Sequence, residues 1–339
     1  MVETTPAAAR ELRAIQYLRA LAALSVVVYH ASQWTGRAEV LLSAGVDVFF
    51  VVSGFIMWRT TMDGRTGPGR FLARRAIRIV PLYWLITLGL TAAALIAPAR
   101  FSDQQPTLPH VLLSLGFIQH LNPRGEPFPL LQLGWTLNYE AIFYLLFAIA
   151  LALPKDWRLR FLVFVLVSGA LGGFVYPPGY VLLLNPMLLE FLAGVLLAAG
   201  LGRSRGPGRP VGWLLLGLGA AGFAGLALVH PQWDEWRPIF WGPPAFLLVA
   251  GACCIEADGG VPRLPPLGLM GDASYSTYLT HPLTLGVLGK TLGLRSPLTF
   301  VLAVLLAQAV GIACWRLLER PMTAWLKGRF GVERPAPGA

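Results

Sequence analysis

Acidic side chains are scarce in this sequence, with 17 Asp and Glu among 339 residues. All charged residues together make up 13%, about half of the ~25% usual in soluble domains. The chain has few charges and 55% hydrophobic residues. This composition excludes a disordered chain, a soluble globular protein, a collagen and a coiled coil. It indicates an integral membrane protein.

Cysteine is rare as well. The three cysteines, Cys253, Cys254 and Cys314, all lie in apolar stretches. An odd number with one adjacent pair argues against a disulfide framework and against a zinc site. The five histidines are isolated, and none has the H-x3-H spacing of a metal-binding helix. We therefore expect no metal and no permanently bound cofactor.

Basic residues outnumber acidic ones and give a net charge of +10. Basic patches can bind the phosphates of nucleic acids. Here the charges lie in short clusters between apolar runs, which is typical of the cytoplasmic loops of membrane proteins. The pattern argues against a nucleic-acid partner and predicts contact with membrane lipids.

Long apolar runs are abundant, and a helix needs about 20 such residues to cross the hydrocarbon core. The sequence predicts an all-α, polytopic membrane protein with about ten transmembrane helices in one domain, residues 1–339. The expected spans lie near 12–33, 42–60, 78–97, 134–152, 160–177, 181–200, 211–229, 238–255, 272–290 and 297–318. The apolar stretch 108–121 is too short to cross and is predicted to be re-entrant or interfacial.

The basic residues also predict the orientation. With the N-terminus in the cytoplasm, ten spans place most Lys and Arg residues in cytoplasmic loops and return the C-terminus to the cytoplasm. An additional crossing at 108–121 would move every later loop to the other side and largely cancel this bias. Since nine spans follow the apolar run 20–29, we interpret that run as the first helix rather than as a cleaved signal peptide.

The first span holds the ionisable residues Arg19 and His30. Arg19 and His30 are eleven residues apart, which puts them about 20° apart around a helix and about 16 Å apart along it. They therefore share one face. Arg19 is either a site residue or a side chain that reaches back to the headgroups, and His30 is either a site residue or a cap of the helix end.

The next two spans carry further polar residues. Asp47 is expected at the start of the second span, where Ser53 and Gly54 would let another helix backbone approach closely. The third span begins with an arginine cluster, Arg74, Arg75 and Arg78. Guanidinium groups bind phosphate bidentately, so the cluster suits either anionic lipid headgroups or a phosphorylated cytosolic substrate. Residue chemistry by itself favours lipid.

Glu140 and His281 are the remaining polar residues inside spans. A carboxylate in an apolar helix needs a partner, and the candidates for Glu140 are Arg19 or an arginine of the 74–78 cluster. Such a pair serves either a site or helix packing. His281 precedes Pro282 within a span, where a proline implies a kink. His281 is either a packing donor or a site residue.

Six motifs occur in order along the chain. They are R-x10-H in the first span, GVDVFFVVSGF at 45–55, RRxxRxxP at 74–81, WTLNYE at 135–140, SYSTYLTHP at 274–282 and ERP at 319–321. On these motifs the chain resembles the acyltransferase-3 family of bacterial membrane proteins over essentially its whole length. The segments IQYLRALAALSVVVYHA and WTLNYE are most similar to the branch that decorates exopolysaccharides.

The resemblance implies an O-acyltransferase of the bacterial inner membrane. It would move an acyl group, usually acetyl, from cytosolic acyl-CoA to a hydroxyl of a cell-surface glycan or lipid-linked oligosaccharide. His30 would be the catalytic base and Arg19 its motif partner. The phosphates of coenzyme A would be held by Arg74, Arg75 and Arg78.

The chemistry of the residues agrees with these roles. A hydroxyl is a weak nucleophile and needs an adjacent base such as imidazole. Asp47 and Glu140 are candidates to orient that imidazole, as the aspartate does in a Ser-His-Asp triad. Ser53, Tyr275 and His281 are predicted to support the site or to contact substrate.

A transporter or flippase for glycans or lipid-linked sugars is the alternative hypothesis, because buried charges in ten helices suit transport too. The sequence shows no internal repeat of the kind found in many transporters, which counts against it. A sensor or scaffold is a weaker third hypothesis.

Overall fold

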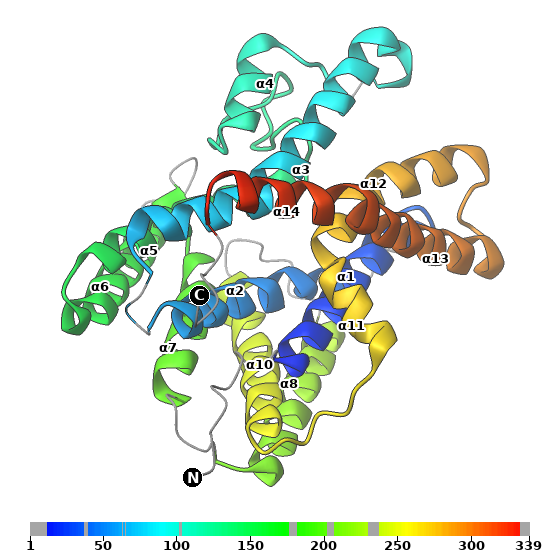
Figure 1. Cartoon of the computed structure of the whole chain (residues 1–339). Coiled ribbons are helices and arrows are strands. Elements are labelled where there is room, and N and C mark those ends of the chain that lie inside the picture. The colour runs from blue at the N-terminus through cyan, green and yellow to red at the C-terminus, as the bar shows by residue number, and fades with distance from the viewer. Residues whose placement is uncertain are drawn as a thin grey trace.

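The computed structural model describes residues 12–36, 40–62, 64, 66–101, 104–175, 182–201, 207–229 and 237–332. All regular elements within these residues are helices, which confirms the all-α prediction (Figure 1). The α-helices are α1 (Arg13–Gln33), α2 (Gly45–Thr61), α3 (Pro68–Ile96), α4 (Leu108–Leu115), α5 (Gly134–Ala152), α6 (Lys155–Val175), α7 (Leu188–Leu201), α8 (Arg209–Val229), α9 (Arg237–Phe240), α10 (Gly242–Ala257), α11 (Pro265–Asp272), α12 (Ser274–Thr291), α13 (Pro297–Cys314) and α14 (Arg320–Arg329).

Six helical segments are long and apolar enough to cross a membrane, within the described ranges. They are Arg13–Gln33, Val40–Thr61, Pro68–Ile96, Gly134–Ala152, Arg209–Val229 and Pro297–Arg329. The shorter apolar helices α7 and α10 also coincide with predicted spans. The predicted spans 160–177 and 181–200 lie partly outside the described residues. The fold is that of a helical, multi-pass membrane protein.

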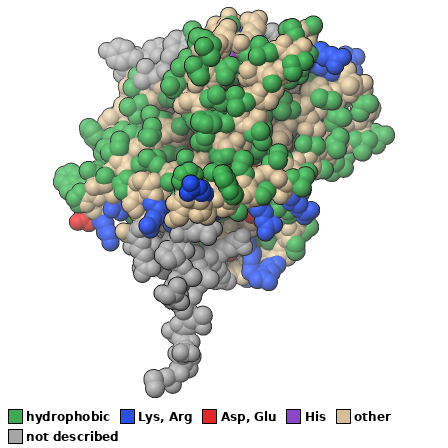
Figure 2. All heavy atoms as spheres, turned by 45° about the horizontal axis from the view of Figure 1, so that its top comes forward, with side chains coloured by type: hydrophobic (Ala, Val, Ile, Leu, Met, Phe, Trp, Pro, Cys, Tyr) green, Lys and Arg blue, Asp and Glu red, His purple; other side chains and the backbone are tan. Residues whose placement is uncertain are grey.

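The outer surface is apolar, as contact with lipid requires. Hydrophobic side chains cover most of the face in Figure 2, and Lys and Arg side chains gather mainly along its lower rim. On α8 and α13 large apolar side chains are exposed, among them Leu214, Leu298 and Leu305. Exposed apolar area of this extent marks a surface that meets a membrane or another protein.

The third helix begins ten residues earlier than the sequence predicts, at Pro68 rather than near residue 78. Proline suits the first turn of a helix, because its missing N–H has no partner there. Arginine is a good helix former although it lowers the hydropathy of the segment. The hydropathy-based boundary was therefore wrong, and the arginine cluster lies on α3 itself.

The segment 108–121 does not cross the bundle. It forms α4, which has eight residues and a length of about 12 Å. The hydroxyl of Tyr83 and the indole N–H of Trp84 donate to the carbonyls of Ser114 and Leu115, which fixes α4 against α3. This confirms that the segment is too short to cross. Burial and the neighbouring His120 lower the pKa of His110 on α4 to about 4, so that imidazole is uncharged at neutral pH.

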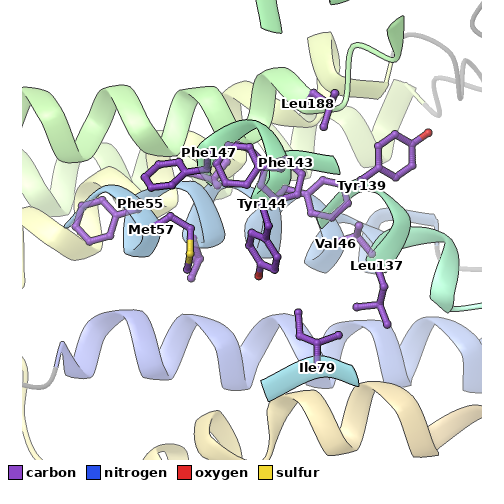
Figure 3. Close-up of a cluster of buried hydrophobic side chains, with 14 of the residues drawn as sticks. Val46, Phe55, Met57, Ile79, Leu137, Tyr139, Phe143, Tyr144, Phe147 and Leu188 are labelled. Carbon is purple, nitrogen blue, oxygen red and sulfur yellow. The ribbon is translucent and has the colours of Figure 1, made fainter. Parts of the chain in front are cut away.

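Aromatic stacking joins α2, α5 and α7 into the centre of the bundle. The ring of Phe191 on α7 lies between Phe50 of α2 and Phe143 of α5, with centroid distances of 4.4 and 4.5 Å. Figure 3 shows how Phe143 and Phe147 of α5 face the α2 side chains of Phe55 and Met57. These buried rings fix the spacing of α2 and α5, which carry motif residues, and of α7, which packs between them.

The same helices meet backbone to backbone at two glycines. A Cβ at Gly54 of α2 would overlap the carbonyl of Phe191, and a Cβ at Gly194 of α7 would overlap the carbonyl of Val51. Small residues permit such contact between membrane helices. The close approach that Ser53 and Gly54 predict is confirmed.

The glycine contact predicts a stability difference between two similar substitutions. We expect Gly54→Ala to destabilise the protein by about 1–3 kcal/mol, because the helices must separate to admit the methyl group. Gly217→Ala on α8 has open space around the new Cβ and is the matched control. Thermal unfolding in detergent should show a lower melting temperature for Gly54→Ala alone. Equal melting temperatures would contradict the close α2–α7 contact.

Candidate active site

One face of α1 packs against α12 through Arg19 and His30. The Arg19 guanidinium donates to the Ser274 hydroxyl at 2.8 Å, and further along the same face the His30 ring lies 3.2 Å from the His281 ring, Nδ1 to Nε2. The shared face predicted from the spacing of Arg19 and His30 brings R-x10-H against SYSTYLTHP. Two motifs that are far apart in sequence therefore form one site.

A cavity of about 130 Å³ opens between α1, α2, α3, α5 and α12. Its polar lining consists of Arg19, Ser53, Arg75, Arg78, Thr136, Glu140, Tyr144, Ser274, Tyr275 and Tyr278. The opposite wall is apolar and comes mainly from α2, with Phe49, Phe50 and Met57. Side chains from five of the six motifs thus meet at one hollow, whose lining is partly charged and partly apolar.

Two arginines of the cavity have unused hydrogen-bonding capacity. The Nε of Arg75 is buried and has no hydrogen-bond partner, and its guanidinium lies 5.8 Å from the centre of the Phe71 ring. Arg78 makes no hydrogen bond or ion pair with the described part of the chain. Leaving guanidinium donors unpaired in a partly buried site costs free energy unless a ligand satisfies them. Both side chains are therefore suited to an anionic group.

The third arginine of the cluster points elsewhere. Arg74 donates from Nε to the carbonyl of Val332 at 3.3 Å, next to the C-terminal helix α14, and does not line the cavity. Consecutive residues of a helix point in directions about 100° apart, and here Arg75 faces the cavity while Arg74 faces the C-terminal segment. The predicted triple cluster is in fact a cavity pair, Arg75 and Arg78, and one arginine that holds the C-terminal segment.

Glu140 lies in the cavity wall without an ion pair. Its carboxylate accepts a hydrogen bond from the Ser53 hydroxyl at 3.1 Å, and that hydroxyl is 3.5 Å from the hydroxyl of Tyr144. Among the described residues no arginine forms an ion pair with it, so the predicted direct pairing with Arg19 or the 74–78 cluster is wrong. The carboxylate shares the cavity with those guanidiniums and leaves their donors available.

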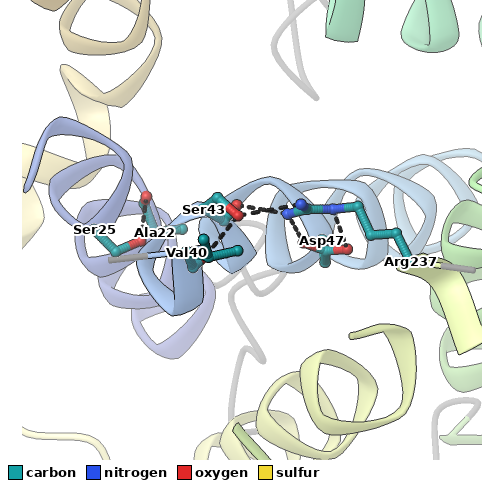
Figure 4. Close-up of polar contacts among 6 residues, drawn as sticks. All are labelled: Ala22, Ser25, Val40, Ser43, Asp47 and Arg237. Atoms are coloured by element: carbon teal, nitrogen blue, oxygen red, sulfur yellow. Dashed lines mark hydrogen bonds and ion pairs between the residues drawn. The ribbon is translucent and has the colours of Figure 1, made fainter. Parts of the chain in front are cut away.

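Asp47 has a different partner from the one that the sequence suggests. It is fully buried in the first turn of α2 and accepts two hydrogen bonds from Arg237, at 2.6 and 3.1 Å (Figure 4). Arg237 also donates to the hydroxyl and the carbonyl of Ser43. Asp47 therefore does not contact the imidazole of His30, and neither does Glu140. The predicted orienting role of these carboxylates is corrected, because Asp47 is bound by Arg237 and Glu140 by the Ser53 hydroxyl.

The two histidines lie beside the cavity rather than in its wall. His281 is fully buried, and its ring centroid is 5.0 Å from that of His30. Tyr278 connects the two parts of the site: it lines the cavity, and its ring lies 6.0 Å from that of His281. Its hydroxyl is 3.0 Å from that of Thr136 on α5. The site thus has an arginine-lined cavity at one end and a histidine pair at the other.

Comparison with known proteins explains why these motifs converge. A family model described as an acyltransferase domain, Acyl_transf_3, matches residues 12–316. The chain belongs to this acyltransferase family. The matched region contains R-x10-H and every other motif except the last, so the expected family is confirmed.

Two relatives of the acyltransferase cover most of its length. The chain is 40% identical over 319 residues to the exopolysaccharide production protein ExoZ of Rhizobium meliloti (strain 1021), covering 89% of this chain and 99% of ExoZ. It is 27% identical over 289 residues to BcsY of Komagataeibacter xylinus, which is named provisionally as a membrane-bound transacylase. This match covers 79% of the chain and 72% of BcsY. No solved structure matches the chain.

Several residues of the acyltransferase site are not apparent from sequence. Tyr278 precedes His281 by three positions, and this helical spacing places both on one face. The sequence could therefore have predicted Tyr278 as a neighbour of His281. Arg237 had none, because its partner Asp47 lies 190 residues away. Glu319 of the ERP motif accepts a hydrogen bond from Ser276 of SYSTYLTHP at 2.6 Å, which only the packing of α12 on the last helix shows. No group of three or more His, Cys, Asp or Glu side chains in the described ranges is arranged for a metal ion.

The buried pair of Asp47 and Arg237 predicts a strong coupling in stability. We expect Asp47→Ala and Arg237→Ala each to cost about 3–5 kcal/mol, because each breaks a buried, hydrogen-bonded ion pair. The double variant should lose less than the sum of the two. Unfolding of all three variants in detergent measures the coupling.

The exposed ion pair between Arg124 and Glu126 is the matched control for this cycle. Its atoms lie 3.7 Å apart, and its side chains are 43% and 45% exposed. Glu126→Ala should therefore cost at most about 1 kcal/mol. A similar loss for Asp47→Ala would show that the buried pair contributes nothing beyond a surface contact.

Proposed function

We propose that this acyltransferase moves an acyl group, in the first place acetyl, from cytosolic acyl-CoA to a hydroxyl of a cell-surface glycan or exopolysaccharide. The observation that carries the proposal is the pair of cavity arginines, Arg75 and Arg78. Their guanidinium groups donate no hydrogen bond to any residue that the structure describes. The family supplies the reaction class, and the name of ExoZ supports an exopolysaccharide as acceptor.

The cavity suits coenzyme A in two respects. Guanidinium groups recognise phosphate oxygens through paired N–H donors, and the cavity presents two such groups on one turn of α3. The apolar wall from α2, with Phe49 and Met57, suits the largely apolar pantetheine arm. The pantetheine arm separates the phosphates of coenzyme A from the thioester. The two ends of the site are also separated, because Arg19 and His30 are about 16 Å apart along α1.

The orientation of the site follows from a ten-span topology in the bacterial inner membrane, with both termini in the cytoplasm. The contacts between distant segments support it, because each joins residues predicted on one side. They are Arg13 to Val261 and Arg74 to Val332 on the cytoplasmic side, and Lys290 to Arg100 and Arg237 to Asp47 on the outer side. The arginine cavity then opens toward cytosolic coenzyme A, and His30 lies nearer the outer face.

His30 supplies the base in this proposal. Its Nδ1 is 2.9 Å from the carbonyl of Val26, which only accepts hydrogen bonds, so Nδ1 carries the proton and Nε2 is the basic nitrogen. The acceptor hydroxyl gives its proton to Nε2 while its oxygen attacks the thioester carbonyl carbon. The carbon–sulfur bond then breaks, and the imidazolium returns the proton to sulfur. The products are an ester and free coenzyme A.

Purified protein incubated with labelled acetyl-CoA tests the enzyme proposal directly. We expect release of free coenzyme A that depends on protein and increases when the acceptor glycan is added. His30→Ala should lower the rate about 10²–10⁴-fold, since it removes the general base. The control is donor affinity, which should stay at the wild-type value because His30 does not line the cavity. Unchanged acetyl-CoA after incubation with wild type and glycan would favour a transporter.

The arginines predict the opposite kinetic pattern. Arg75→Lys and Arg78→Lys should each weaken acetyl-CoA binding by roughly tenfold or more, because a charge-assisted hydrogen bond contributes about 1.5–3 kcal/mol. Arg74→Lys on the same helix is the matched control and should bind the donor normally, since Arg74 points away from the cavity. Calorimetry with and without anionic lipid measures these affinities. Wild-type affinity in the Arg75 and Arg78 variants would identify the cluster as a lipid contact or topology signal.

A further inference from the structure

We infer that His281 is the positioning residue for His30: a neutral imidazole that accepts a hydrogen bond from Nδ1 of the base and so directs Nε2 toward the reacting groups. This inference rests on the proposed function and adds to it the partner that holds the base. In a Ser-His-Asp triad a carboxylate has this role. Here a second histidine takes it.

The hydrogen bonds of His281 determine its tautomer. Nδ1 of His281 lies 3.0 Å from the carbonyl of Thr277, one turn earlier on α12. A carbonyl only accepts hydrogen bonds, so Nδ1 must carry a proton. In the neutral ring Nε2 then has a lone pair and no proton. This lone pair is the only hydrogen-bonding capacity that His281 has left.

That lone pair is directed at His30. The distance from Nε2 of His281 to Nδ1 of His30 is 3.2 Å, and Nδ1 of His30 also lies 2.9 Å from the carbonyl of Val26. Nδ1–H of His30 is therefore shared between two acceptors, the carbonyl and the imidazole of His281. With both acceptors on Nδ1, the proton cannot move to Nε2 without breaking both hydrogen bonds. Nε2 of His30 stays available as the base.

No carboxylate in the described part of the chain competes for this position. Asp47 is bound by Arg237, and Glu140 is bound by Ser53. A neutral acceptor also suits the location, because His281 is fully buried and an ionised carboxylate there would carry a large desolvation cost. When His30 takes the hydroxyl proton, its Nδ1–H keeps an acceptor. The imidazolium is stabilised without a second charge in the apolar interior.

Substitution by two amides distinguishes this role from simple packing. The side-chain oxygen of glutamine reaches about the position of Nε2 of histidine, whereas that of asparagine reaches only about the position of Nδ1. His281→Gln therefore keeps an acceptor for His30, and His281→Asn removes it while introducing the same functional group. Any loss of folding caused by removing the imidazole affects both variants and is monitored by their melting temperatures.

The kinetic experiment measures kcat and KM for acetyl-CoA with the acceptor glycan. We expect His281→Asn to lower kcat about 10- to 100-fold, as losing the partner that orients a functional histidine does elsewhere. His281→Gln should keep most of the wild-type kcat. KM for acetyl-CoA should not change in either variant, because His281 does not line the arginine cavity. Equal kcat values for the two amides at equal melting temperature would overturn the inference.

Nitrogen NMR of protein labelled with ¹⁵N-histidine gives a readout that does not depend on activity. The chain has five histidines, and the His30 and His281 signals are identified by their loss in His30→Ala and His281→Gln. We expect both rings to be neutral with the proton on Nδ1, and the Nδ1–H signal of His30 to shift in His281→Asn more than in His281→Gln. A proton on Nε2 of His30 would overturn the inference. If the wild type transfers no acyl group, the proposed function fails, and this measurement still decides whether His281 accepts from His30.

Discussion

The contact between one face of α1 and α12 is the interaction on which the site depends. Arg19 meets Ser274 at one end of this face, and His30 meets His281 at the other. Because both helices are rigid, a single packing arrangement sets the distance between Arg19 and the histidine pair. Glycine contacts between α2 and α7 and the stacked rings of α5 then place the third wall of the cavity against this pair.

Burial of charge in an apolar bundle divides the polar residues into two groups. Asp47 is satisfied within the protein by Arg237, and Glu319 by Ser276. These contacts hold segments together, since removing either partner would leave a buried polar group unpaired. Arg75 and Arg78 are different because the described residues do not use their donors. The unsatisfied donors distinguish a candidate binding site from structural pairing, although both kinds of residue look alike in sequence.

The histidine pair shows how two imidazoles can be held in one tautomer inside an apolar bundle without a carboxylate. Each ring donates from Nδ1 to a carbonyl of its own helix, one turn earlier. The helix backbone therefore selects the tautomer of both rings, and the position of α12 determines that one ring faces the other. The orientation of the His30 ring comes from helix geometry and packing, with no carboxylate beside it among the described residues.

Local sequence patterns determine much of this protein. Apolar runs and sparse charge specify a helical membrane protein, and the eleven-residue spacing of Arg19 and His30 specifies one helix face, because both properties depend only on neighbouring residues. The start of α3 was missed because arginine lowers hydropathy without weakening a helix. Only the tertiary structure decided which charges meet. Asp47 pairs with Arg237 and does not contact His30. Arg74 points away from the cavity that Arg75 lines. His281 contacts His30 although the two are 251 residues apart in the sequence. Such contacts depend on how helices pack, and no local pattern records a partner so distant in the chain.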